Sequence, residues 1–258
     1  MIHLKSKREI EAIARGGRII GALHDELSER IVPGMTTAAV DAFADAFIRS
    51  HEGATSAFKG LYGFPGSVCV SVNEEVVHGI PSEDRVLVEG DIVSVDVGVR
   101  LDEWCSDSAW TFAVGEIDGE TAELLRVTEA SLDNAVAATR TGGNVGDIGA
   151  AVMETVKGTP FKIIRDLVGH GVGRDVHEDP QVPNYGVAGR GAELREGLVL
   201  AIEPMLSAGS DQIRTLDDRW TVVSADGSRT AHFEHTVAIT REGPRILTGQ
   251  PDAVESAA

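Results

Sequence analysis

Residues 89–97 read EGDIVSVDV, and residues 196–204 read EGLVLAIEP. In both stretches a Glu-Gly pair precedes an apolar run that ends in an acidic residue, Asp96 in the first and Glu203 in the second. The helix-breaking pairs at 33–34 and 141–142 are separated by the same interval to within one residue. Two landmarks with one shift indicate an internal repeat of about a hundred residues. The alternative is coincidence, since Glu-Gly before a strand is a common turn.

The predicted elements around these strands also follow one order twice. Residues 6–9 (SKRE) form a capping box, and apolar residues at helical spacing follow until Val32-Pro33-Gly34. A second amphipathic run places Val40, Phe43 and Phe47 on one face. The apolar positions of the first helix are Ile10, Ile13, Gly17, Ile20 and Leu23.

Strand patterns take over from Ser67, including a hairpin with strands at 92–100 and about 105–114. Helical periodicity returns between about 119 and 156, interrupted at 141–143, and strands resume from Phe161. This order predicts a duplicated α+β unit of about a hundred residues.

Composition limits the class of protein. The hydrophobic fraction of 42% supports a full core, and the net charge of −18 argues against nucleic acid or an anionic membrane as a partner. No apolar stretch approaches the length of a membrane span, and no signal peptide is evident. We therefore expect a cytoplasmic protein with no disulfide framework, although one bond between Cys69 and Cys105 stays open.

Four acidic residues stand out within the strand patterns. A carboxylate in a strand that is buried on both faces is costly unless it is paired or bound to a metal, which applies to Asp96 and Glu203. The bland alternative for each is an acid at a solvated strand end. If the hairpin turns near residues 101–102, Asp107 lies opposite Asp96 with its side chain on the same face. Glu234, in the last strand pattern, can pair with the Glu203 strand in the same way.

Convergence of these four carboxylates points to metal ions. Without cations they would repel one another and could not all stay ionised. Two divalent cations would cancel the four charges, and oxygen-rich ligands suit Mn, Fe or Co better than structural zinc sites with thiolates.

Three histidines lie beside glycine-rich turns. His170 stands between Gly169 and Gly171, which let another group approach it closely, and His177 follows seven residues later. His78 occupies a similar place in the first half, in the stretch 78–81 (HGIP). A single histidine is more often a core or surface residue, but three in such positions favour a site.

These blocks resemble the type I methionine aminopeptidases, and the resemblance extends from about residue 5 to 249. The matching blocks, in the family's order and spacing, are VCVSVNE (68–74), HGIP (78–81), GDIV (90–93) with Asp96 and Asp107, GHG (169–171), HEDPQV (177–182), AIEPM (201–205) and FEHT (233–236). The resemblance implies the pita-bread fold, in which two related α/β halves enclose a central antiparallel sheet. It would form one catalytic domain at 1–249, with halves at about 1–115 and 116–249. Residues 250–258 are expected to form a flexible tail.

The resemblance also assigns residues to roles. It implies a dinuclear site held by Asp96, Asp107, His170, Glu203 and Glu234. His78 and His177 would contact the substrate and, with Glu203, carry out catalysis. The methionine pocket would be lined by Phe58, Leu61, Phe64, Cys69 and Trp220. Phe58 and Leu61 depart from the smaller or hydroxylated residues common in the family, which implies a more apolar rim.

The implied activity is removal of the initiator methionine from nascent chains with a small second residue. Co, Mn or Fe would serve as the two divalent ions, with Zn as a further candidate and a monovalent cation near Asn73. A hydroxide bridging the metals would attack the scissile carbonyl, and Glu203 would move the proton. The resemblance further suggests a monomer that meets its substrate at the ribosome.

Other members of the superfamily fit less well. The type II enzymes carry a large insertion that the short segment between His177 and Glu203 lacks, and the Xaa-Pro enzymes carry an extra N-terminal domain. Three rival classes are a non-catalytic binding protein of this fold, an exopeptidase for another bond, and a structural metal protein. The last is disfavoured because no set of thiolate ligands is present.

Overall fold

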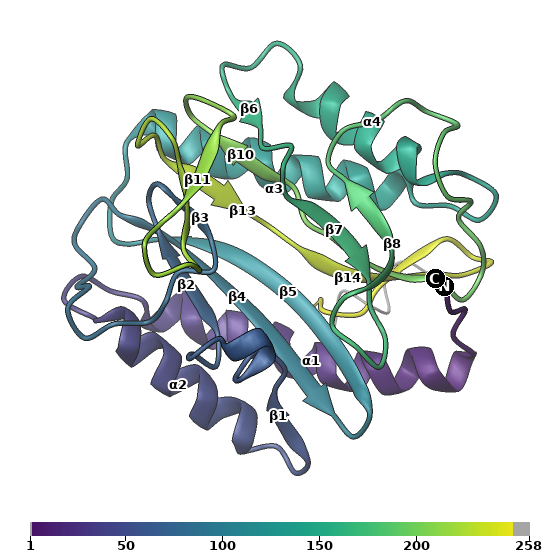
Figure 1. Ribbon diagram of the computed structural model, residues 1–258, viewed down its shortest axis with the longest axis horizontal. Helices are drawn as coiled ribbons and strands as arrows, with labels where there is room; N and C mark the ends of the chain where they lie inside the picture. Colours follow the sequence, from purple (N-terminus) through teal and green to yellow (C-terminus); the bar gives the residue numbers. More distant parts are fainter. Residues whose placement is uncertain (1, 250–258) are drawn as a thin grey trace.

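The computed structural model describes residues 2–249, and its elements follow the order of two helices and a group of strands twice (Figure 1). The first helix pair and the elements that follow it are α1 (Lys7–Arg30), α2 (Thr37–Arg49), β1 (Ala54–Ser56), the 3-10 helix η1 (Leu61–Gly63), β2 (Cys69–Val72), β3 (Glu75–Val77), β4 (Ile92–Leu101) and β5 (Trp104–Ala113). The second pair and its strands are α3 (Gly119–Ala138), α4 (Val145–Val156), β6 (Lys162–Ile163), β7 (Val168–Gly171), β8 (Glu178–Pro183), β9 (Val199–Ile202), β10 (Met205–Ser207), β11 (Ile213–Thr215), β12 (Val222–Ser224), β13 (Thr230–His232), β14 (His235–Ile239) and β15 (Pro244–Ile246). The predicted α+β class is confirmed; the expected tail at 250–258 lies outside the described residues.

The first helix begins at the predicted capping box. The hydroxyl of Ser6 accepts a hydrogen bond from the Glu9 N–H, and the Glu9 carboxylate accepts one from the Ser6 N–H at 2.8 Å. The buried face of α2 was only partly predicted, because Val40, Ala44 and Ile48 are buried while Phe43 and Phe47 are half-buried beside them. The broad rings cover the edge of the core, and the smaller side chains fit against the sheet.

Strands β4 and β5 form the predicted hairpin, but the residue of β5 that pairs with Asp96 lies two positions after the expected one. Leu101 pairs with Trp104, so the tight turn is made by Asp102, in a left-handed conformation with a φ of 56°, and the next residue. Asp96 therefore pairs with Ala109, and Asp107 with Gly98; the expectation that the two aspartates face each other directly was wrong. Since Asp96 and Gly98 are two positions apart, both carboxylates still lie on one face, as diagonal neighbours.

The strands lie between the two helix pairs, with α1 beside β4 and β5, α2 beside β1 and β2, and α3 and α4 on the other side (Figure 1). A five-stranded antiparallel sheet has the order β15-β14-β9-β7-β8, and His235 of β14 pairs with Ile202 of β9. The predicted pairing of the Glu234 and Glu203 strands is thus confirmed. One apolar cluster fills the space between α1, α2 and β4, and another fills that between α3, α4 and β9.

Side-chain and backbone hydrogen bonds join β5 to the segment that leads into β14. The Thr236 hydroxyl donates to the Asp107 carbonyl at 2.7 Å and accepts from the Asp107 N–H at 3.0 Å. The Glu234 N–H donates to the Ala109 carbonyl at 2.9 Å. This seam brings the acidic residues of the two repeats together.

Helix α1 packs closely on the segment that follows β15. A Cβ atom on Gly17 would lie 2.1 Å from the Leu247 carbonyl oxygen, and one on Gly21 would lie 2.9 Å from that of Gly249. Only glycine permits such an approach of helix and chain.

Both cysteines, Cys69 and Cys105, are buried and free. Within residues 2–249 no helix combines the length and apolarity that crossing a membrane requires.

Candidate metal centre

All the predicted site residues line one cavity of about 260 Å³. The acidic residues reach it from four places in the fold. Asp96 and Asp107 project from the middle of the β4–β5 hairpin, Glu203 follows β9, and Glu234 lies between β13 and β14. His170 reaches the same cavity from β7. Strands, or residues directly next to a strand, therefore supply every predicted metal-binding side chain.

The polar atoms of these residues are close enough to share ions. Ligand atoms of Asp107, His170 and Glu234 all lie within 4.8 Å of one another. His170 Nε2 is 3.4 Å from Glu203 Oε1 and 3.9 Å from Asp107 Oδ2. Such spacing suits donors that surround a cation.

The electrostatics of the cavity are unfavourable for bare carboxylates. Burial raises the pKa of Asp96 to about 7. Burial also raises the pKa values of Asp107, Glu203 and Glu234 well above the ordinary range, and for Asp107 the neighbouring charges of Asp96 and Glu203 add to the rise. Among the described lining residues there is no lysine or arginine to offset these charges.

Several buried oxygen atoms of these carboxylates lack a polar partner. Asp96 Oδ1, Asp107 Oδ1 and Glu234 Oε1 have no hydrogen-bond partner and are shielded from solvent. An unpaired buried carboxylate oxygen is costly, whereas coordination of a divalent cation satisfies it. The donor set of four carboxylates and one imidazole therefore fits the dinuclear centre that was predicted, and oxygen-preferring divalent ions suit it best.

His170 is oriented as a metal-binding imidazole would be. Its Nδ1 lies 3.0 Å from the Gly171 carbonyl oxygen, so Nδ1–H is the donor and Nε2 keeps its lone pair. Burial lowers the pKa of His170 to about 4, which keeps the ring neutral. The flanking glycines are needed by the sheet, because Cβ atoms at Gly169 and Gly171 would meet the carbonyls of Ala201 and Asp179 at 2.3 and 2.2 Å.

The other two predicted histidines lie at the rim of this group. The ring of His177 is 4.5 Å from that of His170, centroid to centroid, and Tyr62 stacks on it at 6.3 Å. His78 has a left-handed backbone with a φ of 60°, and its ring approaches Trp220 at 6.3 Å. Burial lowers the pKa of both histidines, so both are neutral donors at pH 7.

An apolar pocket adjoins the carboxylates. The ring of Phe64 meets that of Trp220 edge-on at 5.2 Å. Phe58 packs on Gly98, where a Cβ atom would lie only 2.5 Å from the Phe58 ring. Leu61 and Cys69 complete the predicted pocket residues, and burial raises the pKa of the Cys69 thiol well above its usual range.

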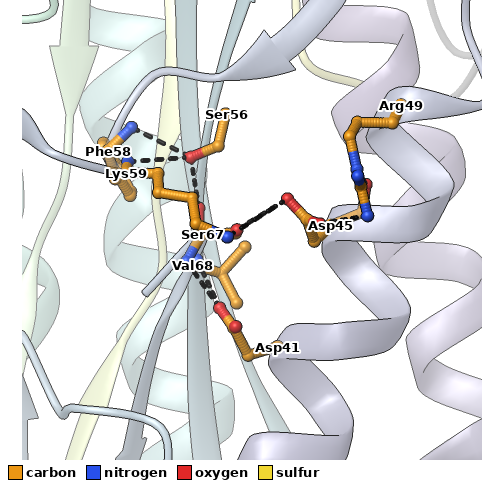
Figure 2. Close-up of polar contacts among 8 residues, drawn as sticks. All are labelled: Asp41, Asp45, Arg49, Ser56, Phe58, Lys59, Ser67 and Val68. Atoms are coloured by element: carbon orange, nitrogen blue, oxygen red, sulfur yellow. Dashed lines mark hydrogen bonds and ion pairs between the residues drawn. The ribbon is translucent and has the colours of Figure 1, made fainter. Parts of the chain in front are cut away.

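Helix α2 holds the loop that carries this pocket (Figure 2). Asp41 Oδ1 accepts hydrogen bonds from the N–H groups of Ser67 and Val68, at 2.6 and 3.0 Å. Asp45 Oδ1 accepts one from the Ser67 hydroxyl at 2.7 Å, and the Ser56 hydroxyl donates to the Ser67 carbonyl at 2.6 Å. These two aspartates were not predicted, since acidic residues on a helix carry no sign of a partner loop.

Other lining residues also escaped prediction. His232 follows the alternation of the strand pattern, two residues before Glu234, so its place on the cavity face could have been inferred. Tyr62 lies between the predicted pocket residues Leu61 and Phe64 and lines the cavity with them. Nothing in the sequence singles out the rest, which are Val77, Leu167, Val168 and Met205.

A second and larger hollow, of about 1380 Å³, lies elsewhere on the molecule. Residues of α1 and of the segment 239–249 line it, and it includes none of the predicted site residues. The chemistry that the sequence predicts thus belongs to the smaller cavity.

Known proteins match this arrangement over nearly the whole chain. The model of metallopeptidase family M24 matches residues 11–241. Methionine aminopeptidase 1 of Bacillus subtilis (strain 168) is 49% identical over 248 residues, which cover 96% of this chain and 99% of that protein. The chain belongs to the methionine aminopeptidases of metallopeptidase family M24.

Solved structures of methionine aminopeptidases agree. The structure from Thermotoga maritima has a TM-score of 0.95 at 46% identity, covering 97% of this chain and all of that one (100%). The prolidase of Pyrococcus furiosus, at 24% identity, has a TM-score of 0.76 over 96% of this chain and 65% of its own, and so shares the fold alone. The pita-bread fold is thereby confirmed, as is the resemblance to the type I enzymes.

Proposed function

We propose that this protein removes the initiator methionine from nascent polypeptides, preferring a small second residue. The observation that carries the proposal is the cluster of four buried carboxylates and His170 at the base of an apolar pocket. Relatives that are called methionine aminopeptidase, and that match end to end, support the same activity. On this proposal the protein works in the cytoplasm as a monomer and meets its substrates near the ribosome.

We assign the two divalent ions to the predicted ligands, with Co, Mn or Fe as the leading candidates and Zn as a further one. Asp96, Asp107, His170, Glu203 and Glu234 would hold them. When bound, such ions lower the pKa of a water molecule and polarise a carbonyl group. A monovalent cation beside Asn73, whose carbonyl already accepts the Thr230 N–H at 2.9 Å, belongs to the same proposal.

The protein's own groups move the proton and hold the substrate. Glu203, with its raised pKa, takes the proton of the attacking water at a carboxylate oxygen and delivers it to the leaving amine nitrogen. The neutral His177 donates a hydrogen bond to the carbonyl oxygen as negative charge develops on it. His78 contacts the substrate backbone, since its ring lines the same cavity as the carboxylates and approaches Trp220 of the apolar pocket.

The pocket supplies the preference for methionine. Phe58, Phe64 and Trp220 surround a space that suits an unbranched thioether, and sulfur makes favourable contacts with aromatic ring edges. The enclosure also excludes water from the side chain of the first residue. Phe58 and Leu61 make this rim apolar, so binding of methionine relies on burial of surface rather than on hydrogen bonds.

A peptide assay tests the proposal. The purified full chain, supplied in turn with Mn²⁺, Fe²⁺ or Co²⁺, should release methionine from Met-Ala-Ser and cleave Met-Leu-Ser far more slowly. An Xaa-Pro peptide in parallel should remain intact. Release from the Xaa-Pro peptide alone would establish a different exopeptidase, and no release with any metal would leave a binding protein of this fold.

A further inference from the structure

His232 is a wholly buried histidine in the candidate metal centre for which the proposed mechanism has no role. Its side chain is 2% exposed, and it lines the cavity beside His78 and Glu203. Neither ring nitrogen has a hydrogen-bond partner among the described residues. The nearest charged acceptor is Glu203, whose Oε2 lies 3.6 Å from His232 Nε2.

The backbone fixes the direction of this ring. Alternation along the strand sends Ala231 and Phe233 into the apolar core and His232 and Glu234 to the cavity. The main chain of His232 is held on both sides by Thr111, whose hydroxyl accepts its N–H at 3.0 Å and donates to its carbonyl at 2.8 Å. The imidazole therefore has little freedom to seek another partner.

A buried N–H without an acceptor costs about 1–3 kcal/mol. A neutral imidazole carries one N–H donor and one lone pair. The ionised carboxylate of Glu203 accepts hydrogen bonds at both of its oxygens, so it satisfies an imidazole donor. Hydrogen bonds of this kind are often long in a free site and shorten when the site is filled.

We propose that His232 is a positioning residue that donates a hydrogen bond from Nε2 to Oε2 of Glu203 and so fixes the direction of this carboxylate. Oε1 of Glu203 is then turned toward His170, whose Nε2 lies 3.4 Å away. His232 acts on the metals only through Glu203. The compact set of ligand atoms found in residues 2–249 comprises Asp107, His170 and Glu234 and does not include it.

The inference rests on the proposed function for its kinetic consequence but not for its effect on metal binding. Outer groups that orient a ligand commonly change metal affinity or activity by about 10–100-fold. His232→Leu removes the N–H donor and puts an apolar side chain of similar size in its place. His232→Gln places an amide N–H where Nε2 stands, whereas His232→Asn places one at the Nδ1 position and serves as the matched control.

The test uses the full chain, stripped of metal with a chelator and titrated with Co²⁺ in a calorimeter. We expect His232→Leu and His232→Asn to weaken Co²⁺ binding by about 10–100-fold, and His232→Gln to stay within about threefold of the parent. The kcat for Met-Ala-Ser should follow the same order, with KM nearly constant. In a Glu203→Gln background, His232→Leu should add little, because the two residues act as one unit.

Three outcomes would overturn the proposal: parental Co²⁺ affinity in His232→Leu, equal losses in the Gln and Leu variants, or full additivity with Glu203→Gln. Melting temperatures of the metal-free variants verify that each one is folded. If the parent protein releases no methionine, the proposed function fails, but the Co²⁺ titrations still decide whether His232 positions Glu203.

Discussion

At the scale of single residues, Asp107 and His78 illustrate how the proposed roles can be separated. Both line one cavity, yet Asp107 belongs to the compact set of ligand atoms, and the His78 ring packs on Trp220 instead. A change at the first should therefore affect metal binding, and a change at the second should affect the substrate.

We expect Asp107→Ala to lose bound metal, and His78→Ala to keep it while kcat falls by about 10²–10⁴-fold. Metal content after dialysis, measured by elemental analysis, is compared with kcat for Met-Ala-Ser. Equal metal loss in the two variants would show that His78 is a ligand.

The sequence was informative about residues wherever an acid or a histidine interrupts an apolar strand. Asp96 and Glu203 are costly in such strands unless bound, and the structure places both on the cavity. His232 obeys the same rule, but the family resemblance assigns it no role. Tyr62 lies in the same segment as the predicted pocket residues Leu61 and Phe64, but the direction of its side chain depends on the left-handed turn between Gly60 and Gly63.

At the scale of elements, α2 and the pocket loop depend on each other. Asp41 accepts two backbone N–H groups of that loop, which a substitution would leave unpaired in a partly buried place. The loop leads from Phe58 and Phe64 to Cys69, so its displacement would reshape the pocket without reaching the carboxylates.

We expect Asp41→Ala to lower the free energy of unfolding by about 1–3 kcal/mol and to raise KM for Met-Ala-Ser several-fold at constant Co²⁺ affinity. Urea unfolding and steady-state kinetics provide the measurements. Arg49→Ala is the matched control on the same helix: it removes an exposed guanidinium that pairs with Asp45 and leaves both hydrogen bonds of Asp41 in place, so it should cost at most about 1 kcal/mol. A loss of Co²⁺ affinity in Asp41→Ala would contradict the separation of loop and metal centre.

Element boundaries followed from local signals, whereas register did not. The capping box at Ser6 and the break at Pro33-Gly34 are local features, and α1 begins and ends where they predict. The place of the turn in the β4–β5 hairpin depends on which residue adopts a positive φ. Asp102 does so, and the turn lies at residues 102–103, one position after the assumed 101–102. A shift of one residue on each strand was enough to turn opposite aspartates into diagonal ones.

At the scale of the whole molecule, the buried carboxylates link stability to pH and to metal. In the metal-free protein their pKa values are raised by burial, that of Asp96 to about 7 and those of Asp107, Glu203 and Glu234 well above the ordinary range. The folded state then holds protons that the unfolded chain releases near pH 4, so stability is lost as the pH rises through the folded pKa values.

The buried histidines change stability with pH in the opposite direction, and they do so only in the acidic range. Burial lowers the pKa of His24 to about 4 and that of His235 to about 4, which costs stability only below about pH 6.5, where the unfolded histidines become protonated. The window from about pH 6.5 to 8 therefore reports the carboxylates.

Across this window we expect the metal-free protein to lose stability by up to about 1.4 kcal/mol per pH unit for each carboxyl that titrates. Saturating Co²⁺ should abolish the loss, and Glu234→Gln should reduce the slope of the metal-free protein. Urea unfolding at several pH values gives the free energies. A slope of zero in the metal-free parent would mean that the carboxylates are already ionised without metal.

The duplication was visible in the sequence because both copies keep a Glu-Gly turn and an acidic strand end. The seam between the copies was not, since the bonds between Asp107 and Thr236 join residues far apart that have no local signature. Local pattern could specify each half, but only the fold decides how the halves meet.

The close approach of Gly17 to Leu247 bears on how the protein is made. The segment that receives α1 is synthesised about 230 residues after it, and contacts of such long range form late in folding. While still attached to its ribosome, the emerging chain has a first helix without its counterpart. Closure of this contact must await the segment after β15, so a chain arrested before Leu247 would leave the side of α1 that carries Gly17 and Gly21 uncovered and open to chaperones and proteases.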